Sequence, residues 1–223
     1  LGRHAPYREH PFAALNTAFI SDGALIHVPD GVALETPVHV VYYSTLASDE
    51  PSVSHPRTLV LIGANSQATV VESYTGEGAY FTNSVTEVVA GAGGVVDHYK
   101  LGLESDEAHH VATMQTRQGR DSKVSTHSIS LGGRLVRNDI NALLAGEGSD
   151  AIINGLYMLA NDQHVDNHTL IEHAEPNCTS HELYKGILGG GSHGVFRGKI
   201  FVHQKAQQTD SYQSNQNLLL SPD

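Results

Sequence analysis

The sequence has very little sulfur chemistry and no tryptophan. Its 223 residues include one cysteine and two methionines. A single cysteine excludes an internal disulfide framework and fits a reducing compartment, as in the cytoplasm. No stretch approaches the roughly 18 consecutive apolar residues that a membrane-spanning helix needs. We therefore expect no association with a membrane.

Basic residues are also scarce. The chain has 13 Lys and Arg against 24 Asp and Glu, which gives a formal net charge of −11. Binding to the phosphates of nucleic acids requires clustered positive charge. The composition therefore disfavours a nucleic acid as the main partner.

Long helical patterns are absent as well. From Phe19 onward, short runs rich in Val, Ile, Leu, Thr and Tyr alternate with Gly, Asn, Asp and Ser, a pattern typical of strands and turns. Clear examples are residues 24–28, 38–43, 58–62 and 69–71. The sequence predicts an all-β chain with strands of about four to six residues.

The turns recur at a regular interval. After a first gap of about 34 residues, small or polar corners follow one another about every 28 residues. They lie at residues 30–31, 63–65, 91–94, 119–121, 146–149, 176–177 and 204–205. This spacing predicts a single-stranded parallel, right-handed β-helix with a repeat of about 28 residues. A sandwich or barrel with irregular hairpins is the alternative all-β fold.

The domain organisation follows from the same pattern. Residues 1–18 mix polar, apolar and proline residues and predict a loop or short helical lead-in. Residues 19–223 form the predicted β-helix core. The chain opens without Met and stops without an obvious cap, so we expect a fragment of a longer protein.

Residues 173–186 contain Cys178 between His173 and His181. A thiol near imidazoles suggests a nucleophile or a metal ligand. The alternative is a turn at Pro176-Asn177 followed by a cysteine that packs in the core. Cys178 and His181 lie three residues apart around a corner, so they are expected to point in different directions. We therefore predict no catalytic residue here and keep both only as weak metal candidates.

His164, Asp166 and His168 are the best candidates for a metal site. Positions i, i+2 and i+4 of a strand share one face, so these three side chains could converge on zinc or iron. The alternative is a polar strand face in contact with solvent. A small metal-binding protein is thus one alternative function.

A second alternative function is a β-helix enzyme that acts on glycans. Glu172 and Glu175 flank the stretch that contains the cysteine, but only their proximity in sequence supports acid–base work. The segment 194–200 lacks the spacing and the Ser or Thr of a phosphate loop. In the tail at 209–220, a run of amide and hydroxyl side chains is followed by three leucines. These leucines are expected to require an apolar surface that covers them.

Several segments resemble the SufB/SufD family core. They are His-Val-Asp-Asn-His-Thr-Leu-Ile-Glu-His at 164–173, Cys-Thr-Ser-His-Glu-Leu-Tyr-Lys-Gly-Ile-Leu at 178–188, and Val-Phe-Arg-Gly-Lys-Ile at 195–200. The segment at 204–221 and the upstream segments that begin at His10 and Ile26 fit the same family, so the match spans nearly the whole chain. The closing Thr-Asp-Ser-Tyr-Gln-Ser-Asn is similar to the SufD branch.

The resemblance implies a scaffold of the SUF iron–sulfur cluster assembly system rather than an enzyme. It implies a β-helix core that pairs with SufB, with a homodimer through the β-helix as a further arrangement, and contact with the separate ATPase subunit SufC through a C-terminal helical part. An iron–sulfur cluster would be present only transiently in the full complex, with no resident cofactor. The expected location is the cytoplasm, or the plastid in a plant.

The departures from the family pattern limit what can be transferred. The family's Lys-Cys-Ser-His-Gly-Ala-Thr segment and its C-terminal helical domain would follow Asp223, so the C-terminal part of the family domain is expected to be missing. We therefore assign no catalytic or cofactor-binding residue. The weak metal candidates remain His164, Asp166, His168, Cys178 and His181.

Overall fold

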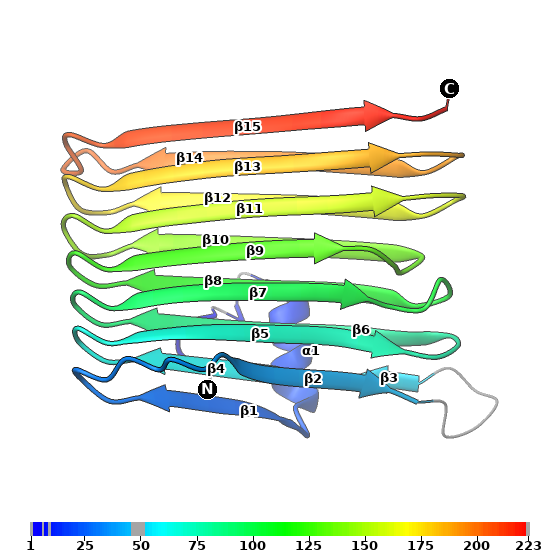
Figure 1. Cartoon of the computed structure of the whole chain (residues 1–223), viewed down its shortest axis with the longest axis horizontal. Coiled ribbons are helices and arrows are strands. Elements are labelled where there is room, and N and C mark those ends of the chain that lie inside the picture. The colour runs from blue at the N-terminus through cyan, green and yellow to red at the C-terminus, as the bar shows by residue number, and fades with distance from the viewer. Residues whose placement is uncertain (1, 6, 9, 46–51, 222–223) are drawn as a thin grey trace.

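The protein is a flattened β-helix made of two parallel sheets. The structure, a computed structural model, describes residues 2–5, 7–8, 10–45 and 52–221. It is 62% strand and 4% helix, and it winds through about six turns with a repeat of about 28 residues. Figure 1 shows the coils stacked from the N-terminal end to the C-terminal end, with one helix behind them. The predicted all-β parallel β-helix is confirmed.

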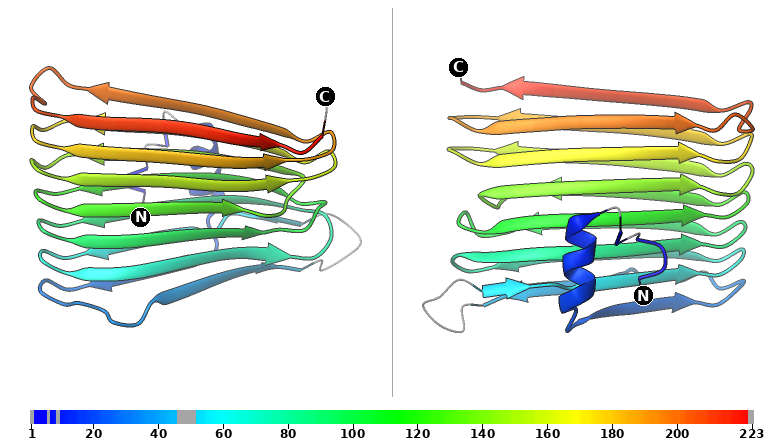
Figure 2. Two further views of the ribbon diagram at one scale, coloured as in Figure 1. Left: turned by 45° about the horizontal axis from the view of Figure 1, so that its top comes forward. Right: turned by 180° about the vertical axis from the view of Figure 1, so that it is seen from behind.

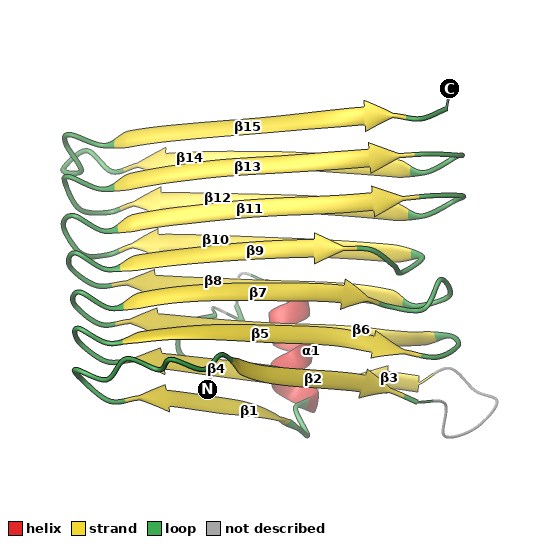
Figure 3. Cartoon of the chain, viewed as in Figure 1, coloured by secondary structure: helices red, strands yellow, loops and turns green. Residues whose placement is uncertain are grey.

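From β4 onward the strands alternate between the two sheets along the chain, and Figure 3 shows them joined by short loops. We call the eight-stranded sheet, which contains β1, β3 and β4, sheet A, and the seven-stranded sheet, which contains β2 and β5, sheet B. The strands of sheet A are β1 Gly23–Val28, β3 Ser52–Ser54, β4 Arg57–Ile62, β6 Tyr80–Ala90, β8 His109–Gln118, β10 Leu135–Leu144, β12 His164–His173 and β14 His193–Val202. Those of sheet B are β2 Val38–Ser44, β5 Gln67–Gly76, β7 Val95–Leu103, β9 Lys123–Ser130, β11 Asp150–Leu159, β13 Thr179–Leu188 and β15 Asp210–Leu219.

Most strands are twice as long as the sequence pattern indicated. From β5 onward they have 8 to 11 residues, so the prediction of four to six was wrong. The reason is that many inward positions are polar, as at His98 and Asn138, which are both buried. These polar residues interrupt the apolar pattern by which a strand is recognised, although the strand continues through them.

The predicted corners all lie at one edge of the β-helix, where a strand of sheet A leads into one of sheet B. Each corner contains one residue with φ between 51° and 72°: Gly31, Asn65, Gly93, Asp121, Gly148, Asn177 or Gln208. From Gly31 to Asn177, the backbone N–H of each of these residues donates to a carbonyl of the next coil. The corners are therefore a hydrogen-bonded column that sets the interval between coils.

From Gly31 to Asn177, glycine alternates with longer side chains in this column for a steric reason. A Cβ atom at Gly93 would lie 2.4 Å from Asn65 Oδ1, and one at Gly148 would lie 2.3 Å from Asp121 Oδ1. The side chain of one corner thus covers the glycine of the next. Because glycine also adopts positive φ without strain, it is favoured at every second corner.

Helix α1, Pro11–Phe19, packs on the outer face of sheet A, as the right view of Figure 2 shows. Asn16 of α1 donates from Nδ2 to the backbone carbonyls of Pro56 and Asn83, both at 2.9 Å. Arg57 Nη1 donates to Thr17 Oγ1 at 2.8 Å. Buried hydrogen bonds therefore fix the helix on the sheet. The division into a lead-in of residues 1–18 and a core of residues 19–223 stays a prediction.

Candidate functional site

Cys178 lies at a corner, where the sequence placed it, directly before β13. Its side chain is fully buried, and Sγ lies 3.3 Å from both the Gly146 carbonyl oxygen and Ser149 Oγ. His181 belongs to the outward positions of β13 and is exposed, whereas His173 is buried inside. The structure therefore separates the thiol from His181.

Other coils place a hydroxyl at the same corner position. Ser122, Ser149 and Thr209 each donate to the carbonyl three residues earlier, at 2.7, 2.9 and 3.0 Å. Like Cys178, each follows directly after the corner residue with positive φ. The cysteine thus replaces a hydroxyl in a structural column, and its thiol lies within donating distance of the Pro176 carbonyl of its own corner and the Gly146 carbonyl of the preceding one.

The outward face of β12 carries His164, Asp166 and His168, as expected. A guanidinium group, however, occupies the space beside them. Arg137 Nη1 donates to Asp166 Oδ2 at 2.8 Å, and its Nη2 lies 3.1 Å from His168 Nδ1. Asp139 also binds this guanidinium, and that hydrogen bond raises the pKa of Arg137 further. The structure shows an ion-pair cluster here and brings His164 close to His193 instead.

Glu172 and Glu175 are not arranged as an acid–base pair. Glu172 pairs with His203, and Glu175 pairs with Lys205. Each carboxylate thus has its own partner in the following coil, an imidazole for Glu172 and an ammonium group for Glu175. In the part of the chain that the structure describes, no group of three or more His, Cys, Asp or Glu residues is placed to hold a metal ion.

A buried polar cluster runs through the interior, and sequence analysis did not find it. We call it the polar column; its members are Glu72, His98, Lys100, Glu104, His110, Asn138 and Asn167. Except for Glu104, these residues take inward positions of their strands, so they alternate along β7 and β10 with outward residues. The signal in the sequence was a polar residue two positions from an inward apolar one, as with Val96 and His98. Only the register identifies which of these positions face one another.

Glu72 is the centre of the N-terminal part of the polar column. Its carboxylate accepts hydrogen bonds from Thr58 and Thr86 and lies 2.9 Å from His98 Nε2. Burial raises the pKa of Glu72, but the hydrogen bond and the charge of His98, together with the two threonines, lower it more. The carboxylate is therefore ionised and fully paired.

Glu104 and His110 form a second buried pair. The imidazole Nδ1 of His110 binds Glu104, Tyr80 donates to the same carboxylate, and Ser84 lies 3.1 Å from His110 Nε2. Burial, assisted by the charge of Lys100, lowers the pKa of His110 to about 4. His110 is thus neutral at pH 7 and donates a hydrogen bond to an ionised Glu104.

Lys100 links these two buried carboxylate–histidine pairs to the following coils. Its ammonium group donates to Asn138 Oδ1 at 2.7 Å, and Asn138 Nδ2 donates to Asn167 Oδ1 at 2.9 Å. Burial lowers the pKa of Lys100 to about 8, although the carboxylates of Glu104 and Glu72 oppose this shift. The partly buried ammonium group of Lys100 therefore lies within the polar column, between the carboxylates of Glu72 and Glu104 and the amide of Asn138.

Glu182 lies in a later coil and differs from these carboxylates. It is buried, and neither carboxylate oxygen has a hydrogen-bond partner among the described residues. Burial raises the pKa of Glu182 to about 7, although a nearby Thr169 hydroxyl partly opposes this shift. At neutral pH this group is therefore close to half protonated.

The fold and interior define a class: a parallel β-solenoid with a paired polar column and a thiol used for structure. Residues 44–223 match the family described as SUF system FeS cluster assembly, SufBD core domain, and residues 1–40 match the SufBD protein N-terminal region. The chain belongs to the SufBD family of the SUF iron–sulfur cluster assembly system. The resemblance to the SufB/SufD family core is thereby confirmed.

Individual relatives agree with this family. An iron–sulfur cluster assembly SufBD family protein of Synechocystis is 31% identical over 94% of this chain and 48% of its own length. The protein ABCI7, chloroplastic, of Arabidopsis thaliana is 32% identical over 95% of this chain and 46% of its own. The iron–sulfur cluster assembly protein SufD of Escherichia coli is 31% identical over 78% of this chain and 42% of its own. The chain thus spans about half the length of the curated relatives it matches.

The described helix offers no membrane span. It is not long and apolar enough to cross a bilayer.

Proposed function

We propose that this chain serves as a SufD-like, non-catalytic scaffold in the SUF system and pairs with SufB-like and SufC-like subunits. The likeness to the SufD protein of Escherichia coli supports the branch, as does the closing Thr-Asp-Ser-Tyr-Gln-Ser-Asn segment. The buried state of Cys178 supports a role without thiol chemistry. The iron–sulfur cluster is cargo of the assembled complex rather than a resident group of this chain.

The observation that carries the proposal is an apolar patch on the outer face of sheet B. Two rows of in-register neighbours form it, and together they are the sheet B patch: Leu101, Ile129 and Leu156 in one row and Met158, Ile187 and Leu218 in the other. Met158 is 46% exposed and Leu218 is 57% exposed. Contiguous apolar surface of this kind marks protein interaction sites.

A shallow cavity of about 280 Å³ adjoins the first row and adds shape to this surface. Leu183 and Leu156 line it, together with the stacked rings of Tyr99 and His127, whose centroids lie 4.7 Å apart. Rigid aromatic and aliphatic groups around a depression suit the apolar anchor of a partner subunit. We therefore place the pairing surface of the scaffold on sheet B.

Co-purification with SufB-like and SufC-like subunits tests the proposal. We expect the chain, in its full-length protein, to be retained by both subunits. A full-length protein that binds neither would show that the scaffold role is wrong. Met158→Lys should weaken retention by about tenfold or more, because a charge would be buried against the partner. Gln207→Lys at an exposed corner is the matched control and should leave retention unchanged.

The proposed location is the cytoplasm, or the plastid if the source is a plant. The Arabidopsis relative that is described as chloroplastic supports the second case.

A homodimer through the β-helix is the arrangement that we expect when no SufB-like subunit is present. Light scattering of the isolated protein measures it.

A further inference from the structure

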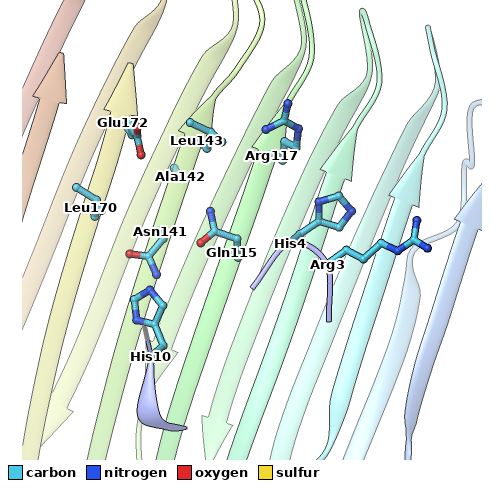
Figure 4. Close-up of a pocket in the computed structure, with 10 residues that line it drawn as sticks. All are labelled: Arg3, His4, His10, Gln115, Arg117, Asn141, Ala142, Leu143, Leu170 and Glu172. Atoms are coloured by element: carbon cyan, nitrogen blue, oxygen red, sulfur yellow. The ribbon is translucent and has the colours of Figure 1, made fainter. Parts of the chain in front are cut away.

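A polar groove lies on the outer face of sheet A, beside the start of α1. Its cavity volume is about 310 Å³, which is enough for a small molecule. The N-terminal segment contributes Arg3, His4 and His10 to its wall. Figure 4 shows that these three side chains come from the segment that crosses the strands, whereas the remaining lining residues come from the strands themselves.

Two cross-strand rows form the floor of the groove. Asn141 of β10 pairs in register with Gln115 of β8 and with Leu170 of β12. One step further along the strands, Leu143 pairs with Arg117 and Glu172. Neighbouring strands lie about 4.8 Å apart, so the side chains of Gln115 and Asn141 lie side by side in this floor.

Glu87 fixes the wall over this floor. The backbone N–H groups of Gly2 and His4 donate to its carboxylate at 2.9 and 2.8 Å. Burial raises the pKa of Glu87, but these backbone hydrogen bonds and the adjacent Arg57 lower it below its ordinary value. An ionised, buried anchor therefore keeps Arg3 and His4 beside the groove.

The groove presents several donors, and one of them has no acceptor. Asn141 Nδ2 is buried and has no hydrogen-bond partner among the described residues. A buried amide without an acceptor costs on the order of 1–3 kcal/mol. Neither Arg3 nor Arg117 forms an ion pair within the part of the chain that the structure describes. Glu172 is the acidic residue of the lining, and its carboxylate lies 2.5 Å from His203 Nε2, within hydrogen-bond distance.

We propose that this groove binds a compact oxyanion, a phosphate or a carboxylate group. Guanidinium groups bind such anions through two parallel hydrogen bonds, and the Asn141 amide would gain the acceptor that it lacks. Helix α1 begins at Pro11, directly after the lining residue His10, so its positive end faces the same region. A metal cation is disfavoured by the charge of the two arginines, and an extended polyanion is disfavoured by the net charge of −11.

Calorimetric titration of the chain with inorganic phosphate, and separately with acetate, at constant ionic strength tests the proposal. We expect one site with a dissociation constant near about 1 mM for at least one anion. Preference for phosphate would define the ligand as phosphorylated, and preference for acetate would define it as a carboxylate. No binding of either anion up to about 20 mM would overturn the proposal.

Three variants locate the site. Arg117→Gln should weaken binding by about tenfold, whereas the exposed Arg120→Gln removes the same charge elsewhere and should leave binding unchanged. Asn141→Leu should weaken binding without lowering the thermal midpoint, because it removes an amide that has no partner. Equal weakening in Arg117→Gln and Arg120→Gln would show general charge attraction and overturn the groove assignment. If Arg117→Gln does not fold, Arg3→Gln in the N-terminal segment provides the same test.

Discussion

The interior of this β-helix contains two unlike regions within the same coils. Near the column of corners lies an apolar stack, in which Val60 pairs with Val88 and Ile62 pairs with Ala90. Toward the other edge lies the polar column, with Glu72, Lys100 and Glu104. The apolar stack stabilises the fold simply because its side chains are removed from water. The polar column loses solvation, so it is tolerated only while each charge keeps its partners.

The two regions therefore respond differently to truncation. Loss of a methyl group from the apolar stack removes only the burial of that group and leaves a small cavity. Loss of one member of the polar column also leaves the groups that it paired buried without a partner. The size of a truncated side chain is thus a poor guide to its effect in this protein, and pairing is the better one.

The largest effect is expected for Glu72→Ala. The substitution leaves His98, Thr58 and Thr86 without their common acceptor inside the protein. Removal of one member of a buried ion pair costs about 3–5 kcal/mol of unfolding free energy. Chemical denaturation followed by circular dichroism measures this loss.

Val88→Ala is the matched truncation in the apolar stack. Val88 is fully buried, and the loss of two methyl groups is expected to cost about 2 kcal/mol through lost burial and a cavity. A smaller cost for Glu72→Ala than for Val88→Ala would contradict the distinction between the two regions.

The next effect concerns Glu182, whose carboxylate lacks the partners that Glu72 has. Burial raises its pKa to about 7, whereas an unfolded chain has an ordinary value of about 4.3. The folded state therefore binds the proton more tightly, and its stability falls as the pH rises from about 4.3 to about 7. Glu182→Gln removes this penalty and should be more stable than the parent by up to about 3 kcal/mol at pH 8.

The same variant should show no gain at pH 4, where Glu182 is protonated in both states. The exposed Glu107→Gln serves as the control and should leave the unfolding free energy unchanged at both pH values. Thermal and denaturant unfolding at the two pH values measure the difference. A gain that is equal at pH 4 and pH 8 would show that the charge of Glu182 is not the cause.

The sequence was sufficient to predict the corners and the stacked coils of the fold. The corner residues Asn65, Asp121 and Asn177 have positive φ, which few residues adopt, and their interval alone indicates stacked coils. The wider first interval of about 34 residues also has a structural counterpart, because β1 and β4 pair Gly23 with Arg57. Backbone geometry at corners is local, so it leaves a clear trace in sequence.

The polar column and the oxyanion groove could not be predicted in the same way. Pairing between coils brings His98 and Lys100 of β7 to Glu72 of β5, and no local pattern states which inward residues meet. The groove needs the N-terminal segment to fold back on β8 and β10, which depends on the buried contact with Glu87. The contacts of this segment with Glu87 join residues 82 to 85 positions apart in the chain, so no local motif predicts them.

The smallest effect is expected for Cys178, which belongs to the apolar cluster but lies at a corner with acceptors. Cys178→Ser should change the unfolding free energy by less than about 0.5 kcal/mol, because a serine hydroxyl can donate to the Gly146 carbonyl as the thiol does. Cys178→Ala should cost about 1 kcal/mol, since it loses both the packing and this hydrogen bond. Chemical denaturation of both variants beside Val88→Ala gives the comparison. A cost for Cys178→Ser as large as that of Val88→Ala would mean that polarity alone, and not the lack of a partner, is what the apolar stack excludes.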